Sequence, residues 1–169
     1  MISTFRIANG MDSKKYDELF IYKSELVREE LGPDDSVVLV DDFTGTGDQA
    51  VTAWNEVFQE LLPTVKNIYL ILVAASEHAK KRIGETTGLI PMSRYTLTGK
   101  DDLFSVRCVI YSTEEKNVLL RYCRMADPDR PRGYGNCGLL LVFSHKCPNN
   151  SLPILYRNVP RWKGLFASI

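Results

Sequence analysis

Near the start of the chain, apolar residues recur with helical periodicity, and a continuous apolar run follows them. Between residues 13 and 31, apolar side chains recur every three or four positions, which predicts an amphipathic helix. These side chains are Tyr16, Leu19, Phe20, Leu26, Val27 and Leu31, with Lys23 among them. Gly32-Pro33 then ends the helix. Residues 36–40, with the sequence SVVLV, are apolar on both faces and β-branched at most positions, as in the central strand of a parallel sheet.

Helix and strand patterns continue to alternate through residue 85. Residues 48–62 are expected to form a helix whose apolar face holds Ala50, Trp54, Val57, Phe58 and Leu61. Residues 67–75 predict a second strand, and Ser76 is suited to cap a third helix that runs to about Glu85. This alternation predicts an α/β fold with a mainly parallel, doubly wound sheet.

The second half of the chain gives a less regular pattern. We expect an irregular excursion at 88–102, a strand at 103–111, a helix at 114–126, a loop at 127–138 and a last buried strand at 138–143. Near the end, Trp162, Leu165 and Phe166 are expected to pack against the sheet. A chain of 169 residues is most simply one domain. Within it we expect an N-terminal helix region (1–35), a βαβα unit (36–87) and a C-terminal part (88–169).

Composition narrows the class of protein. Hydrophobic residues make up 44% of the chain and charged residues 25%, which is typical of a globular protein and not of a disordered one. No apolar run approaches the ~20 residues of a transmembrane helix, and residues 1–10 lack the pattern of a signal peptide. We therefore expect a cytoplasmic protein without a membrane partner. Cys137, His145 and Cys147 do not have the spacing of a metal site.

The net charge is zero, but the charges are unevenly distributed. Residues 1–62 carry 5 basic and 13 acidic side chains, and residues 63–169 carry 16 basic and 8 acidic ones, so the two parts have net charges of −8 and +8. Such asymmetry indicates either a surface for a protein partner or second copy, or two solvated faces that differ. The basic side chains of Arg121, Arg124, Arg130 and Arg132 make a nucleic acid a further candidate partner.

Most of the candidate chemistry lies directly after the first predicted strand. Two acidic residues, Asp41 and Asp42, end this strand, and a short loop rich in Gly and Thr leads into the next helix. Ligands of open α/β sheets bind at the carboxyl ends of the strands. Glycines in such a loop present backbone N–H groups to an anion, the Thr hydroxyls add donors, and the positive end of the helix dipole adds its field. The loop residues are Thr44, Gly45, Thr46, Gly47, Asp48 and Gln49.

This segment resembles the phosphoribosyl-pyrophosphate (PRPP) motif of type I phosphoribosyltransferases. The resemblance implies that Asp41 and Asp42 contact the ribose hydroxyls of PRPP as catalytic-site acids, and that Gly45 to Gln49 bind the 5′-phosphate. The two carboxylates would also suit a hydrated Mg²⁺ that touches the phosphate as well and is bound to Asp41 and Asp42 indirectly, through its waters. Asp48 and Gln49 stand where the common pattern has a small or basic residue and a Thr.

The order Asp-Asp-Phe-x-Gly-x-Gly-x-Gln is similar to the PRTase-CE group, a set of bacterial phosphoribosyltransferase-like proteins associated with conflict and anti-phage gene clusters. The tail carries a second resemblance to that group. It consists of a predicted strand at 138–143, a PNN-x-LP element at 148–153 and a W-x-x-LF element at 162–166. Together these motifs cover roughly residues 36–166.

Two functions are compatible with these motifs. The resemblance implies a PRPP-binding or ribose-phosphate-binding protein of an anti-phage system, which could transfer phosphoribose with Mg²⁺ once its active site is complete. We expect a reduced or missing N-terminal part, because only 36 residues precede Val37 and no pyrophosphate loop is visible. The alternative is therefore a non-catalytic regulatory subunit that docks to a protein or nucleic acid.

Overall fold

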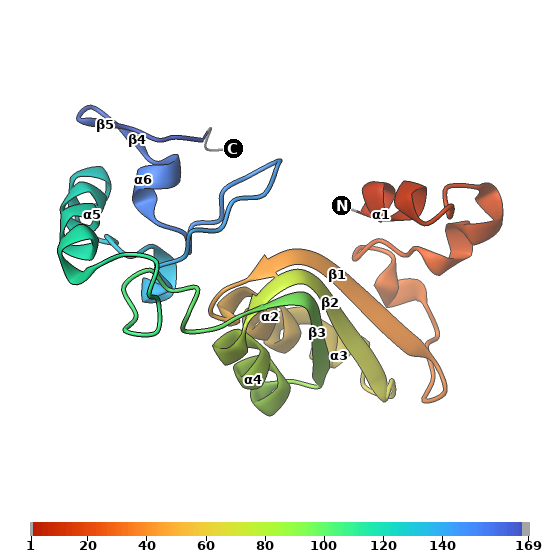
Figure 1. Ribbon diagram of the computed structural model, residues 1–169. Coiled ribbons are helices and arrows are strands. Elements are labelled where there is room, and N and C mark those ends of the chain that lie inside the picture. Colours follow the sequence, from red (N-terminus) through yellow and green to blue (C-terminus); the bar gives the residue numbers. More distant parts are fainter. Residues whose placement is uncertain (1, 167–169) are drawn as a thin grey trace. The chain divides into compact units, whose positions relative to one another are not determined.

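The computed structural model describes residues 2–166 (Figure 1). The chain divides into two compact units with a boundary between Tyr95 and Thr96. The first unit begins with helix α1 (Ile2–Ala8) and two 3₁₀ turns, η1 (Lys14–Leu19) and η2 (Leu26–Arg28). Strand β1 (Ser36–Thr44), strand β2 (Asn67–Ser76), helix α4 (Glu77–Thr86) and strand β3 (Leu89–Leu97) follow. Between β1 and β2 lies one helix in three parts, α2 (Asp48–Ala53), the π-helical turn η3 (Trp54–Phe58) and α3 (Gln59–Leu61).

The three strands form a sheet in the order β1-β2-β3, and β1 and β2 pair in parallel from Ser36↔Asn67 to Thr44↔Ala75. Figure 1 shows α2, α3 and α4 on the same side of this sheet. The α/β class is therefore confirmed. The prediction that residues 36–40 form a central strand is wrong, because β1 lies at the edge and Val38 is 55% exposed. It is the central strand β2 that buries alternate side chains, including Ile68, Leu70 and Leu72.

The helix after β1 was predicted correctly, and it packs closely against the start of β3. Ala50, Trp54, Phe58 and Leu61 contact the core of the first unit. The Trp54 ring lies so near Gly88 that a Cβ atom at Gly88 would be 2.6 Å from Trp54 Cη2. Only a residue without a side chain fits beside that ring.

The predicted helix at 13–31 is wrong. The structure places two 3₁₀ turns there, with Phe20 extended and non-helical chain between the turns. Four consecutive residues of that stretch, from Phe20 to Lys23, line one cavity beside β1. An α-helix would turn consecutive residues by 100° each and could not direct all four to one surface, so contact with the sheet overrides the helical spacing.

The second unit is built around helix α5 (Thr113–Ala126), as predicted for 114–126. The Ser112 side chain accepts from the Glu115 N–H, and the Glu115 side chain accepts from the Ser112 N–H, which is a complete capping box. A short 3₁₀ turn η4 (Tyr134–Asn136), helix α6 (Pro153–Tyr156) and the antiparallel pair β4 (Asn158–Val159) and β5 (Trp162–Lys163) complete the unit. Trp162 donates to the Ile154 carbonyl at 3.1 Å and packs against the core of the second unit. The expected packing is wrong for Leu165 and Phe166, which are 72% and 45% exposed.

Three predictions for the region after residue 87 are wrong. Residues 89–97 form β3, where an irregular excursion was expected. Residues 103–111 form turns, and Val106 is 94% exposed. Residues 138–143 form no strand, since Leu139 makes only isolated bridges to Asp102 and Ser151. An apolar run becomes a strand only where a neighbour supplies a full hydrogen-bonded ladder, and these two runs have none among the described residues.

Candidate functional site

The acidic pair lies within β1 and not after it, because the strand continues to Thr44. Successive residues of a strand point to opposite faces. The two acids accordingly differ: Asp41 is exposed, whereas Asp42 is only 5% exposed. Asp41 Oδ1 accepts the Asp42 N–H at 2.9 Å, which holds the Asp41 carboxylate close to the strand backbone. Of the two predicted ribose ligands, Asp41 is the one that solvent reaches.

The loop after β1 has a fixed backbone shape. Gly47 precedes α2 in the left-handed region, with φ of 83°, and a Cβ there would lie 3.2 Å from Ile83 Cγ1 and 3.4 Å from the Ala79 carbonyl oxygen. Ser76 connects the loop to the next helix. Its hydroxyl donates to the Gly45 carbonyl at 2.6 Å and accepts the Ala79 N–H at 2.9 Å. The loop is thus joined to the first turn of α4, and Ser76 is the N-cap that the sequence predicted.

Asp48 is paired with a cation that the sequence analysis missed. Arg82 Nη1 forms an ion pair with Asp48 and donates to the Thr46 carbonyl at 3.1 Å. The Thr46 hydroxyl donates to Asp48 Oδ2 at 2.7 Å. The Asp48 carboxylate is therefore compensated by the Thr46 hydroxyl within the loop and by Arg82 of α4. No sequence motif identifies Arg82 as a site residue. Its presence could have been inferred only from the need of an acid in such a loop for a nearby cation.

The arrangement offers two kinds of polar group at the carboxyl end of β1. The start of the helix at Asp48 presents backbone N–H groups and the positive end of the helix dipole, which favour an anion. The exposed Asp41 carboxylate suits hydroxyl groups or a hydrated cation. Among residues 2–166, no group of three or more His, Cys, Asp or Glu side chains could hold a metal ion by itself.

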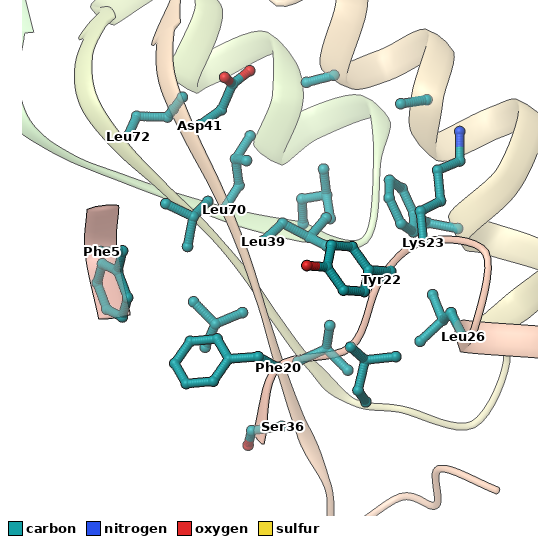
Figure 2. Close-up of a pocket in the computed structure, with 18 of the residues that line it drawn as sticks. Phe5, Phe20, Tyr22, Lys23, Leu26, Ser36, Leu39, Asp41, Leu70 and Leu72 are labelled. Carbon is teal, nitrogen blue, oxygen red and sulfur yellow. The ribbon is translucent and has the colours of Figure 1, made fainter. Parts of the chain in front are cut away.

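A cavity of about 710 Å³ extends along β1 from Ser36 to Thr44 (Figure 2). Its lining comes from the N-terminal segment, from β1, from the buried side chains of β2 and from the helix after β1. Asp41, Thr44 and Gln49 belong to its lining, so three of the predicted site residues border one cavity. The N-terminal contribution was not foreseen, because residues 13–31 were expected to be a helix.

The family of this chain follows from its sequence match. The PRTase-CE family model matches residues 1–167. The chain belongs to the PRTase-CE family. No curated protein and no solved structure matches it. The family match also includes the first 35 residues, which the motif comparison did not cover.

The second PRTase-CE motif, in the tail, has packing partners inside the second unit. The Asn150 amide donates to the Tyr134 carbonyl at 3.1 Å, and the Ser151 hydroxyl donates to the Leu141 carbonyl at 2.6 Å. Leu152 is fully buried. These residues therefore stabilise the loop around η4. Among the described residues, no helix combines the length and the apolar character that a membrane crossing requires.

Proposed function

We propose that this PRTase-CE protein binds PRPP or a related ribose phosphate at the carboxyl end of β1. Asp41, with Asp42 behind it, binds the ribose hydroxyls, and the loop from Thr44 to Gln49 binds the 5′-phosphate through backbone N–H and hydroxyl groups. The proposal extends to phosphoribosyl transfer in a bacterial anti-phage or conflict system, which is what the family resemblance implies.

One observation carries the proposal, namely the compensation of Asp48 by Arg82. An uncompensated carboxylate at the start of α2 would repel a phosphate by several kcal/mol at short range, roughly the energy of two charges near a protein surface. Because Arg82 neutralises it, the loop can present the helix N-terminus to an anion although residues 1–62 carry a net charge of −8.

Mg²⁺ fits the same residues. An exposed carboxylate at Asp41, next to the place proposed for phosphate oxygens, matches the preference of Mg²⁺ for one or two carboxylates plus substrate oxygens and waters. When bound, the ion would offset the negative charge that PRPP brings. Asp41 would position the ribose, and the Gly47 turn would direct the loop N–H groups at the phosphate.

Isothermal titration calorimetry with PRPP and Mg²⁺ tests the proposal. We expect saturable binding to the unmodified protein and a loss of about tenfold or more in affinity for Asp41→Asn, because a charge-assisted hydrogen bond is removed. Asp34→Asn is the matched control, since it removes the same charge from an exposed turn ahead of β1. Absence of PRPP binding, or equal weakening by both variants, would contradict the assignment.

Transfer is tested separately from binding. If the chain also catalyses transfer, adding a nucleophilic acceptor to the PRPP complex forms a bond from the acceptor to C1 of the ribose and breaks the bond from C1 to pyrophosphate. Pyrophosphate release measures this step. Binding without release under any acceptor supports a ligand-sensing role.

The exposed apolar side chains of the second unit favour a second candidate, the non-catalytic regulatory subunit. Val106, Val109 and Ile110 are 94%, 89% and 73% exposed, an unusual concentration of apolar surface. Such a subunit could also dock to a nucleic acid, whose phosphates would contact basic side chains. Arg121 and Arg124 are available for these contacts, whereas Arg132 is paired with Asp102. Fluorescence anisotropy with a labelled oligonucleotide at two salt concentrations tests it, because phosphate contacts weaken steeply as salt rises.

A further inference from the structure

The cavity beside β1 has two chemically different ends. Most of its lining is apolar, including Phe20, Leu39 and Leu70, whereas its polar groups near the phosphate loop are Asp41, Thr44 and Gln49. Figure 2 shows the Asp41 carboxylate at one end of the β1 segment and Ser36 at the other. A ligand that fills this space needs an apolar body and one polar end.

Aromatic side chains form part of the lining. Phe5, Phe20 and Tyr22 of the N-terminal segment line the cavity, and Phe58 lines it from the helix side. Tyr22 and Leu19 are 67% and 68% exposed, so large apolar side chains border a space that they do not fill. A volume of about 710 Å³ lies within the usual range for small-molecule sites, roughly 300 to 1,000 Å³. Aromatic walls of this kind favour a planar aromatic ligand.

Charge defines the polar end. Asp41 places a carboxylate there, and residues 1–95 of the first unit carry 15 acidic and 10 basic side chains. Lys23 is the cation of the lining, and Figure 2 shows its amine pointing away from Leu26. The summed field of this part of the chain therefore favours a positively charged group at the Asp41 end.

We propose that the cavity binds an aromatic ligand with a protonated amine, its rings between the N-terminal segment and the sheet and its amine beside Asp41. Asp41 is also the carboxylate that the proposed function assigns to the ribose, so the amine and a ribose phosphate would occupy it alternately. The cavity itself does not rest on the proposed function, so the two can be tested apart.

Methyl NMR on the full chain with labelled leucines is the direct test. The probe is 1-naphthylmethylamine, and 1-naphthalenemethanol is its neutral counterpart. We expect saturable shifts at Leu39, Leu70 and Leu72, which line the cavity, and none at Leu103 and Leu152 of the second unit. The amine should bind about fivefold to tenfold more tightly than the alcohol, because an ion pair replaces a neutral contact.

Two pairs of variants separate specific binding from general adhesion. Asp41→Asn should abolish the preference for the amine over the alcohol, whereas Asp34→Asn should preserve it. Tyr22→Ala should weaken both probes by about tenfold through the loss of ring contacts, whereas Tyr95→Ala should not. Tyr22 and Tyr95 are both exposed, so neither change threatens folding, and only Tyr22 lines the cavity.

Three results would overturn the proposal: no saturable shift at the cavity leucines, equal affinity for the amine and the alcohol, or equal weakening by the two tyrosine variants. The PRPP titration is independent of these measurements. If the naphthyl probe binds and PRPP does not, the proposed function is wrong and the cavity site stands. If PRPP binds and the naphthyl probe does not, the cavity site is wrong and the proposed function stands.

Discussion

Gly47 permits the sharpest test of how the loop is built. Replacing it with Ala forces a side chain into a φ of 83°, which costs about 1–2 kcal/mol for a residue with a Cβ. The added methyl group would also lie 3.2 Å from Ile83 Cγ1, so the Ile83 side chain has to move by a few tenths of an ångström. Together these effects predict a loss of about 1–3 kcal/mol in the free energy of unfolding of the first unit.

Gly84→Ala is the matched control, because it is also a glycine-to-alanine change but is expected to stabilise the first unit instead of destabilising it. Gly84 lies inside α4, and the nearest atom to an added Cβ is Pro91 Cδ at 3.9 Å. Alanine stabilises a helix interior by roughly 0.5–1 kcal/mol relative to glycine. Gly84→Ala should therefore raise the free energy of unfolding by about that amount.

The two tryptophans of the chain make the assay specific for one unit. Trp54 belongs to the core of the first unit and Trp162 to that of the second. In a Trp162→Phe background, urea unfolding followed by fluorescence reports on Trp54 and hence on the first unit. The reasoning is refuted if Gly47→Ala is as stable as its parent, or if the two alanine variants shift the midpoint in the same direction.

Three further predictions address the loop, the second unit and the cysteines. Because Arg82 and Asp48 are both partly exposed, Arg82→Met and Asp48→Asn should couple by only about 0.2–1 kcal/mol in a double-mutant cycle of unfolding free energies, and a purely additive cycle would contradict the pairing. Burial opposes ionisation of Asp127, but its hydrogen bonds outweigh burial and hold its pKa below the ordinary 3.8. The stability that ionised Asp127 gives the second unit is therefore present above about pH 4 and lost as pH falls further. In urea unfolding from pH 2.5 to 6, the free energy of unfolding of Asp127→Asn should vary less with pH than that of the unmodified protein. Burial raises the pKa of the Cys123 thiol to about 11, so a thiol reagent at pH 8 should leave it unmodified in the native protein while the half-buried Cys137 reacts, as peptide mass spectrometry would show.

The elements that could be predicted from the sequence are those with both strong periodicity and clear ends. The first two strands and the helix that follows each of them agree with the structure within a few residues, apart from the extension of β1 to Thr44. Strand β3 was overlooked because Gly88 and Pro91 suggested irregular chain. Its Pro lies near the start of a strand that is only partly buried, where a missing N–H is tolerated.

The site was predictable only in its local part. Adjacent residues, such as those of the loop from Thr44 to Gln49, can be identified from their order alone. Arg82 lies 34 residues from Asp48, and the cavity wall at Phe20 to Lys23 depends on a chain path that overrides helical spacing. Contacts between distant segments are decided by packing, which single-sequence periodicity does not report.

The close approach of Trp54 to Gly88 has a consequence for how this family can change over time. A side chain at position 88 would collide with the ring, since its Cβ would lie 2.6 Å from Cη2. A substitution at Gly88 therefore requires the Trp54 ring to move, whereas prior replacement of Trp54 by a smaller residue makes room for it. We expect a smaller side chain at position 54 wherever position 88 carries a side chain.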